Sequence, residues 1–172
     1  MNAPESKAGE AASLAARFGA WIYEGIILFG LIWFSDYAFD ALTQSKHALV
    51  LRHARMVFLF LVLGLYFVYF WHKGQTLPMK TWKIRLRSNN SHRAGQAASW
   101  GQCVLRYVLS WLWFLPPLAA IAPFSLSGGE SAVIVLGWVA VWALLSRFHP
   151  TRQFWHDALA GTRLVHYEIP KK

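Results

Sequence analysis

Charged and polar residues inside apolar stretches are the first candidates for chemistry in this sequence. Arg17 and Glu24 lie seven residues apart in "RFGAWIYE". On a helix, seven steps of about 100° return both side chains to nearly the same face, and Glu24 would lie about 10 Å deeper. An acid inside a membrane helix must face other helices, where it either links them by hydrogen bonds or carries a proton or cation. The residues alone leave both roles open, and Tyr23, Tyr66 and Tyr69 are interpreted as packing residues.

A second polar set follows near the C-terminus, in "RQFWHDALAGTRLVHYEI". Asp157 is expected to pair with an Arg at the membrane face, with Arg17 as the first candidate and Arg106 as the second. His156 and Asp157 are adjacent, and neighbours on a helix point about 100° apart, so we do not expect a catalytic dyad. The sequence also lacks a zinc-ligand spacing, a nucleophile elbow, a phosphate-binding loop and a dinucleotide fingerprint. We therefore expect neither an enzyme nor a bound metal or cofactor.

The composition indicates that helices in a membrane position these residues. Hydrophobic residues make up 56% of the 172 residues, and ten of them are Trp, which is typical of a membrane protein. Helices are expected because an open strand cannot satisfy its backbone in lipid. Four apolar stretches approach the ~20 residues that cross a ~30 Å hydrocarbon core, namely 18–38, 54–72, 102–123 and 131–148. Pro116 and Pro117 should kink or end the third.

The distribution of basic residues predicts the orientation. The net charge is +9, and all but Lys46, Arg52 and Arg55 of the 17 Lys and Arg residues fall on one side of the expected helices. The positive-inside rule places that side, with both termini, in the cytoplasm. Anionic lipid explains this charge better than nucleic acid, because no nucleic-acid motif accompanies it. We expect a mobile cytoplasmic tail over 1–16, no cleavable signal peptide, and one membrane domain over 17–169.

The loop after the second stretch carries a different pattern. In "TWKIRLR", apolar and basic residues alternate with a period of two, which predicts a short strand. The β-branched and aromatic segment "TRLVHYE" is its expected partner, after "HDALAG" has formed a short turn or helix that ends at Gly161. The fold predicted is therefore an all-α membrane protein with four transmembrane helices and a small cytoplasmic two-stranded β ladder, about 81–87 with 162–168.

Three motifs in order resemble those of the RDD family of integral membrane proteins, which is named for an Arg and two Asp. Arg17 and Glu24 match the family's Arg and first Asp, with Glu replacing Asp. "KGQTLPMKTWKIRL" resembles the family's turn into a strand, with Pro78 where Gly is usual, and "RQFWHDALAGTRLV" supplies the second Asp as Asp157. The resemblance extends from Arg17 to Val165. It adds as supporting residues Gln75, Thr76, Lys80 and Gln153, beside Arg106 and His156.

The resemblance implies an integral protein of the bacterial inner (cell) membrane with one of two functions. In the first, the chain is a membrane scaffold or partner-binding subunit in which Arg17, Glu24 and Asp157 clamp the helices together. In the second, it is a small transporter, such as a cation/proton antiporter, in which Glu24 carries the proton or cation. Its partners would be anionic lipid at the cytoplasmic face and either a second copy or another membrane protein. A closed bundle with Glu24 bonded to Arg17 or a tyrosine favours the clamp, whereas an open polar vestibule favours transport.

Overall fold

The computed structural model describes residues 9–44, 51–121, 123–124, 126–145, 148 and 153–167. These residues are mostly helical, with one two-stranded sheet. The elements in chain order are α1 (Leu14–Thr43), α2 (Arg52–His72), α3 (Leu77–Thr81), β1 (Ile84–Ser88), η1 (Ser91–Arg93), α4 (Trp100–Ser110), η2 (Trp111–Trp113), α5 (Leu115–Ile121), α6 (Gly128–Leu145), α7 (Trp155–Leu159) and β2 (Thr162–His166).

The long apolar helices largely follow the predicted stretches. Within the described residues, three segments are long and apolar enough to cross a membrane: Leu14–Thr43, Arg52–Thr81 and Trp100–Ile121. The fourth, α6, is apolar but shorter. The outward sides carry exposed large apolar residues such as Phe29, Leu65 and Val133, and lipid would cover them. Helix α1 begins earlier than the predicted 18–38, because the Ser13 side chain caps it by accepting from the Ala16 backbone N–H.

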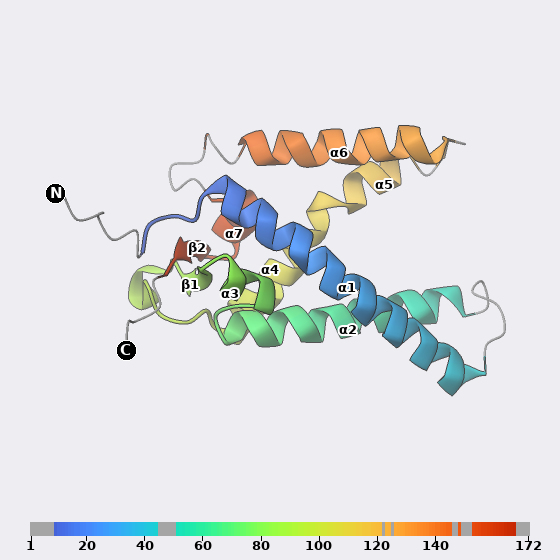
Figure 1. Cartoon of the computed structure of the whole chain (residues 1–172), viewed down its shortest axis with the longest axis horizontal. Helices are drawn as coiled ribbons and strands as arrows, with labels where there is room; N and C mark the ends of the chain where they lie inside the picture. The colour runs from blue at the N-terminus through green and yellow to red at the C-terminus, as the bar shows by residue number, and fades with distance from the viewer. Residues whose placement is uncertain are drawn as a thin grey trace.

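Figure 1 shows α1 crossing α2, while α3, α7 and the sheet gather at one end of the molecule. Helix α2 packs against both α1 and α4, and α6 packs against α5 and η2. The buried apolar core lies where α1, α2 and α4 meet α3 and the sheet. The two ends of the described chain lie together there, since the Gly9 N–H donates to the His166 carbonyl at 2.9 Å.

The third apolar segment is broken, as its prolines predict. Helix α4 ends at Ser110, the 3-10 turn η2 follows, and α5 carries Pro116 and Pro117 in its first turn. Proline has no N–H, so the carbonyl of Leu112 loses the partner that an unbroken helix would give it at Pro116. The indole of Trp138 on α6 donates to this carbonyl at 3.2 Å. The break therefore also provides a hydrogen bond that joins α6 to η2.

The predicted ladder is present, with slightly different bounds. Strands β1 and β2 are antiparallel, with Leu86 opposite Leu164. The ladder starts three residues later than predicted, because α3 continues to Thr81 and Lys83 adopts a left-handed φ of 52°. Gly74, with a φ of 97°, turns the chain after α2 so that its carbonyl accepts from the Leu86 N–H at 2.7 Å. Residue 168 of the predicted ladder lies outside the described residues.

The N-terminal segment lies along the other edge of β2. Gly9 and Ala12 donate from their backbones to the carbonyls of His166 and Leu164, and His166 donates to the Glu10 carbonyl. Residues 1–8 of the predicted mobile tail lie outside the described residues. Within residues 9–16, the chain is hydrogen-bonded to β2 as far as Ser13, whose N–H donates to Nε2 of His166 at 3.1 Å, and α1 begins at Leu14.

Candidate functional site

Glu24 is buried on α1 and bonded to the helices beside it. The Tyr66 hydroxyl on α2 donates to Oε1 at 2.5 Å, and the Thr76 hydroxyl donates to Oε2 at 2.6 Å. Thr76 is itself the N-cap of α3 and accepts from the Met79 backbone N–H. One carboxylate therefore ties α1 to α2 and to the start of α3. The sequence offered Arg17 as a charged neighbour of Glu24, whereas the direct bonds come from two neutral hydroxyls.

Arg106 and Asp157 form a buried ion pair between α4 and α7. The Nε–H of Arg106 donates to Oδ1 of Asp157 at 2.6 Å, and Asp157 is 0% exposed. The guanidinium also lies over the Trp71 ring of α2, 4.0 Å from its centroid. Burial by itself would raise the pKa of Asp157, but the positive charges of Arg106 and Arg17 outweigh it and hold the pKa below its usual value. Asp157 is thus a fixed negative charge that joins three helices through one Arg.

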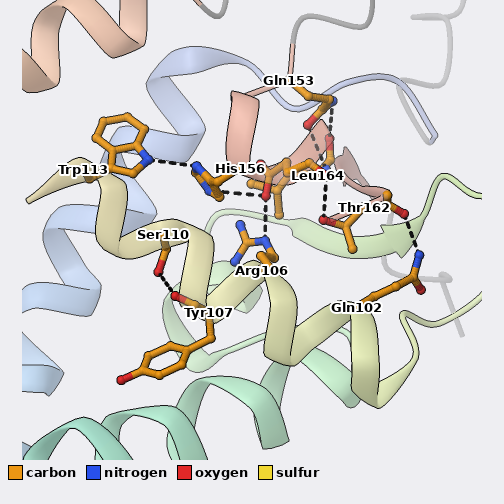
Figure 2. Close-up of polar contacts among 11 residues, drawn as sticks. Gln102, Arg106, Tyr107, Ser110, Trp113, Gln153, His156, Thr162 and Leu164 are labelled. Atoms are coloured by element: carbon orange, nitrogen blue, oxygen red, sulfur yellow. Dashed lines mark hydrogen bonds and ion pairs between the residues drawn. The ribbon is translucent and has the colours of Figure 1, made fainter. Parts of the chain in front are cut away.

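His156 is held in a single protonation form. The Trp113 indole N–H donates to His156 Nδ1 at 2.8 Å (Figure 2). Because an indole nitrogen only donates, Nδ1 must accept, and the imidazole proton lies on Nε2. Nε2 is 3.4 Å from Oδ1 of Asp157. Burial lowers the pKa of His156 to about 4, so the ring is neutral at physiological pH.

The convergence of His156 and Asp157 differs from the helical expectation that adjacent side chains point apart. Both side chains belong to α7, which is only five residues long. The Trp113 indole donates to Nδ1 of His156, and this bond orients the imidazole so that Nε2 faces the Asp157 carboxylate. In Figure 2, dashed lines run from His156 and from Arg106 of α4 to one oxygen, which is Oδ1 of Asp157.

Arg17 lies near this pair but is not the direct partner assigned to Asp157 in the sequence. It is buried on α1, with its guanidinium 5.2 Å from the centre of the Phe154 ring. It interacts with Asp157 electrostatically, while the direct hydrogen bond comes from Arg106. The physical reason is packing: α4 lies directly against α7, and this contact brings Arg106 within hydrogen-bond distance of the Asp157 carboxylate.

The site borders a cavity of about 460 Å³. Four polar residues of the site line it, namely Arg17, Glu24, Arg106 and His156. Most of the remaining wall is aromatic or aliphatic and comes from α1, α2, α4 and η2. Arg17 and Glu24 therefore share one helix face, as their seven-residue spacing predicts. In the described part of the chain, no group of three or more His, Cys, Asp or Glu side chains could hold a metal ion.

A family model described as the RDD family matches residues 11–161. The chain belongs to the RDD family. This membership confirms the resemblance that the three sequence motifs indicate. No curated protein and no solved structure matches the chain.

Gln75 and Gln153, two supporting residues of the RDD motifs, form hydrogen bonds at the end of the molecule that carries the sheet. The Gln153 side chain pairs with the backbone of Leu164, accepting from its N–H at 3.0 Å and donating to its carbonyl at 3.4 Å. The amide therefore binds β2 at the edge that the N-terminal segment also contacts, since the Leu164 carbonyl accepts from the Ala12 N–H as well. Gln75 accepts from Arg85 Nε at 2.6 Å. Lys80 is exposed on α3.

A second ionic cluster of this RDD protein was not identified from the sequence. Arg55 on α2 bonds Asp36 at 2.5 Å and also bonds Asp40, both on α1. The sequence contains a signal for it, because acids four residues apart share a helix face and a basic residue follows near the start of the next helix. Tyr66, interpreted from the sequence as a packing residue, is the tyrosine that donates to Glu24, and Trp113 was not identified as a donor. An aromatic residue in an apolar run gives no sign of which group its polar atom will meet.

Proposed function

We propose that this RDD protein is a non-enzymatic integral protein of the cell membrane that acts as a membrane scaffold or partner-binding subunit. The observation that carries the proposal is the bonding of its buried charges. Glu24 is bonded to Tyr66 and Thr76, and Asp157 is bonded to Arg106. These bonds link α1 to α2 and α3, and α4 to α7. Buried charges that are bonded in this way hold the helices together. The outer faces of the helices then remain available to a partner.

The proposal includes an orientation. The end of the molecule with the sheet, α3 and α7 carries the exposed Lys80 and the partly exposed Arg85, Arg87 and Arg163. We place this end, with both termini, at the cytoplasmic face of a bacterial inner membrane, against anionic lipid. Cysteine residues introduced at Ser91 and at Ser127, in a Cys103→Ser background, test this placement. A membrane-impermeant thiol reagent applied outside the cell should label position 127 and not position 91, and the reverse pattern would refute the orientation.

The scaffold proposal is tested by cross-linking in native membranes followed by purification of the tagged chain. We expect one partner, a second copy or another membrane protein, in stoichiometric yield. Asp157→Asn should lose this partner while remaining inserted, because α7 and the sheet would no longer be fixed to α4. The matched control is Glu130→Gln, which changes an exposed acid at the start of α6. Recovery of the intact chain without any stoichiometric partner would refute the scaffold role.

The alternative function is cation/proton transport, and one observation favours it: Glu24 lines the cavity together with Arg17. A carboxylate at a cavity within the membrane could take up a proton or cation and release it elsewhere. Four helices offer little room for a complete path, so this mechanism calls for an oligomer. In proteoliposomes carrying a cation gradient, Glu24→Gln should abolish proton flux and Glu130→Gln should leave it intact. Equal flux in parent and Glu24→Gln protein would exclude Glu24 as the carrier.

A further inference from the structure

The cavity beside Glu24 has the features of a binding site for an amphiphile. Its volume of about 460 Å³ falls within the ~300–1,000 Å³ typical of small-molecule sites. Its apolar wall includes Phe18, Trp21 and Leu28 of α1. Trp21 and the neighbouring Ile22, which also lines the cavity, are 46% and 62% exposed. Helix α1 is long and apolar enough to cross a membrane. In the membrane placement proposed above, this rim would face hydrocarbon, and a lipid chain would enter the cavity without crossing water.

The polar end of the cavity carries charges of both signs, and Arg106 there is already bonded to Asp157. Two of the charged residues that line it are Arg17 and Arg106, and the third is Glu24. Both oxygens of Glu24 already accept hydrogen bonds from hydroxyls. His156, which also lines the cavity, is neutral at physiological pH because burial lowers its pKa to about 4. A guanidinium carries five N–H donors in a geometry that suits phosphate and carboxylate oxygens.

We propose that this cavity binds one acyl chain of an anionic lipid, with the phosphate or carboxylate of its headgroup at Arg17. The chain would lie against the aromatic wall formed by α1, α2 and η2. The headgroup would lie at the end of α1 nearest the sheet, where Arg17 begins the second turn of the helix. This proposal requires neither the scaffold role nor transport, and it identifies the ligand by its chemistry: an apolar tail and an anionic head.

The structure supplies a matched pair of variants. A side chain added at Gly25 would meet nothing within 4 Å, and Gly25 lines the cavity. Gly30 lies on the same helix with equally open space, but the cavity does not include it. Gly25→Phe should therefore project a ring into the opening of the cavity, while Gly30→Phe should project one into lipid. In both variants the added Cβ has no heavy atom of a neighbour within 4 Å.

The experiment uses the full-length protein in nanodiscs and photoreactive probes with the reactive group near the end of the chain. One probe is a fatty acid, one is a phosphatidylglycerol with the same chain, and one is the uncharged alcohol of that chain. Cross-linked peptides are mapped by mass spectrometry. We expect an anionic probe to label cavity residues of α1 and α4. Labelling should fall about tenfold or more in Gly25→Phe and stay unchanged in Gly30→Phe. Whichever anionic probe labels more strongly identifies the source of the ligand.

The headgroup is tested by the same assay. In the parent protein an anionic probe should label about tenfold more than the alcohol, because a charge-assisted hydrogen bond contributes only to the anion. Arg17→Gln should remove this preference, and Arg17→Lys should retain part of it. If Arg17→Gln does not fold, the comparison of anionic and uncharged probes on the parent protein still shows whether the cavity prefers an anionic headgroup. Equal labelling by both, equal labelling of the two glycine variants, or cross-links between two copies at the cavity would overturn the proposal.

Discussion

The Arg106–Asp157 pair gives the sharpest test of how this membrane domain is held together. Asp157 is completely buried and the Arg106 side chain is 7% exposed, with 2.6 Å between the bonded atoms. Asp157→Asn keeps the shape of the side chain but removes its charge. Arg106 would then remain buried without a counterion, and Arg17 would lose the nearby negative charge that attracts it. Breaking a buried pair from one side costs about 3–5 kcal/mol.

This loss is measurable as a change in melting temperature. For a chain of this length, each kcal/mol corresponds to about 2–4 °C, so the expected decrease is about 6–20 °C. Thermal unfolding in detergent, followed by size-exclusion chromatography of a fluorescent fusion, would detect it. The matched control is Asp40→Asn. Its side chain is 39% exposed, and Arg55 would still pair with Asp36, so this variant should melt close to the parent.

A double-mutant cycle separates the pair from its surroundings. Arg106→Gln alone should also destabilise the fold, because Asp157 would be buried without its bonded cation. The double variant Arg106→Gln/Asp157→Asn buries two neutral amides that can hydrogen-bond to each other. Its loss should be smaller than the sum of the two single losses by about 2 kcal/mol. Strictly additive losses, or an Asp157→Asn protein that melts within about 2 °C of the parent, would refute the idea that this pair fastens α4 to α7.

Two further predictions concern packing and pH. Gly64→Leu should cost about 1–3 kcal/mol or more, because its Cβ would lie 2.9 Å from the Tyr107 ring, whose hydroxyl is bonded to a carbonyl of α2. Gly25→Leu on α1 meets open space and should melt like the parent, and equal losses for the two would contradict the packing described. Because the folded pKa of His156 is about 4, below its ordinary 6.5, its contribution to stability is complete above pH 6.5 and is lost as the pH falls toward 4. The loss amounts to about 3 kcal/mol, so a plot of melting temperature against pH should be flatter over this range for His156→Gln than for the parent. A slope unaffected by His156→Gln would show that the imidazole is not buried neutral.

Local sequence properties were sufficient for several elements of the fold. Pro116 and Pro117 predict the break in the third apolar segment, since a missing N–H interrupts a helix wherever it occurs. Alternation in the segment around Ile84 and Leu86 predicts a strand, because a period of two is a property of the extended backbone itself. Gly161, with a φ of 63°, ends α7 as expected. In each case the cause lies within a few residues of the effect.

The partners of the buried charges depend on the packing of distant helices. The seven-residue spacing correctly places Arg17 and Glu24 on one face, but it does not reveal that Tyr66 and Thr76 would supply the donors for Glu24. It also favours Arg17 over Arg106 as the partner of Asp157, although α4 is the helix that packs on α7. Which side chain reaches a buried carboxylate depends on how two helices cross and rotate about each other.

The sequence by itself therefore determined which segments are apolar, where they bend, which short stretches pair as strands, and which RDD motifs carry charge. These properties follow from the chemistry of single residues and from the periods of helix and strand. Only the tertiary structure decided the bonds of Glu24, the pairing of Asp157 with Arg106, and the orientation of His156 between Trp113 and Asp157. It also revealed the cavity that these residues border. The physical reason is that a polar group in a low-dielectric interior bonds to whichever partner the packing brings within about 3 Å, and that distance is set by residues far apart in the chain.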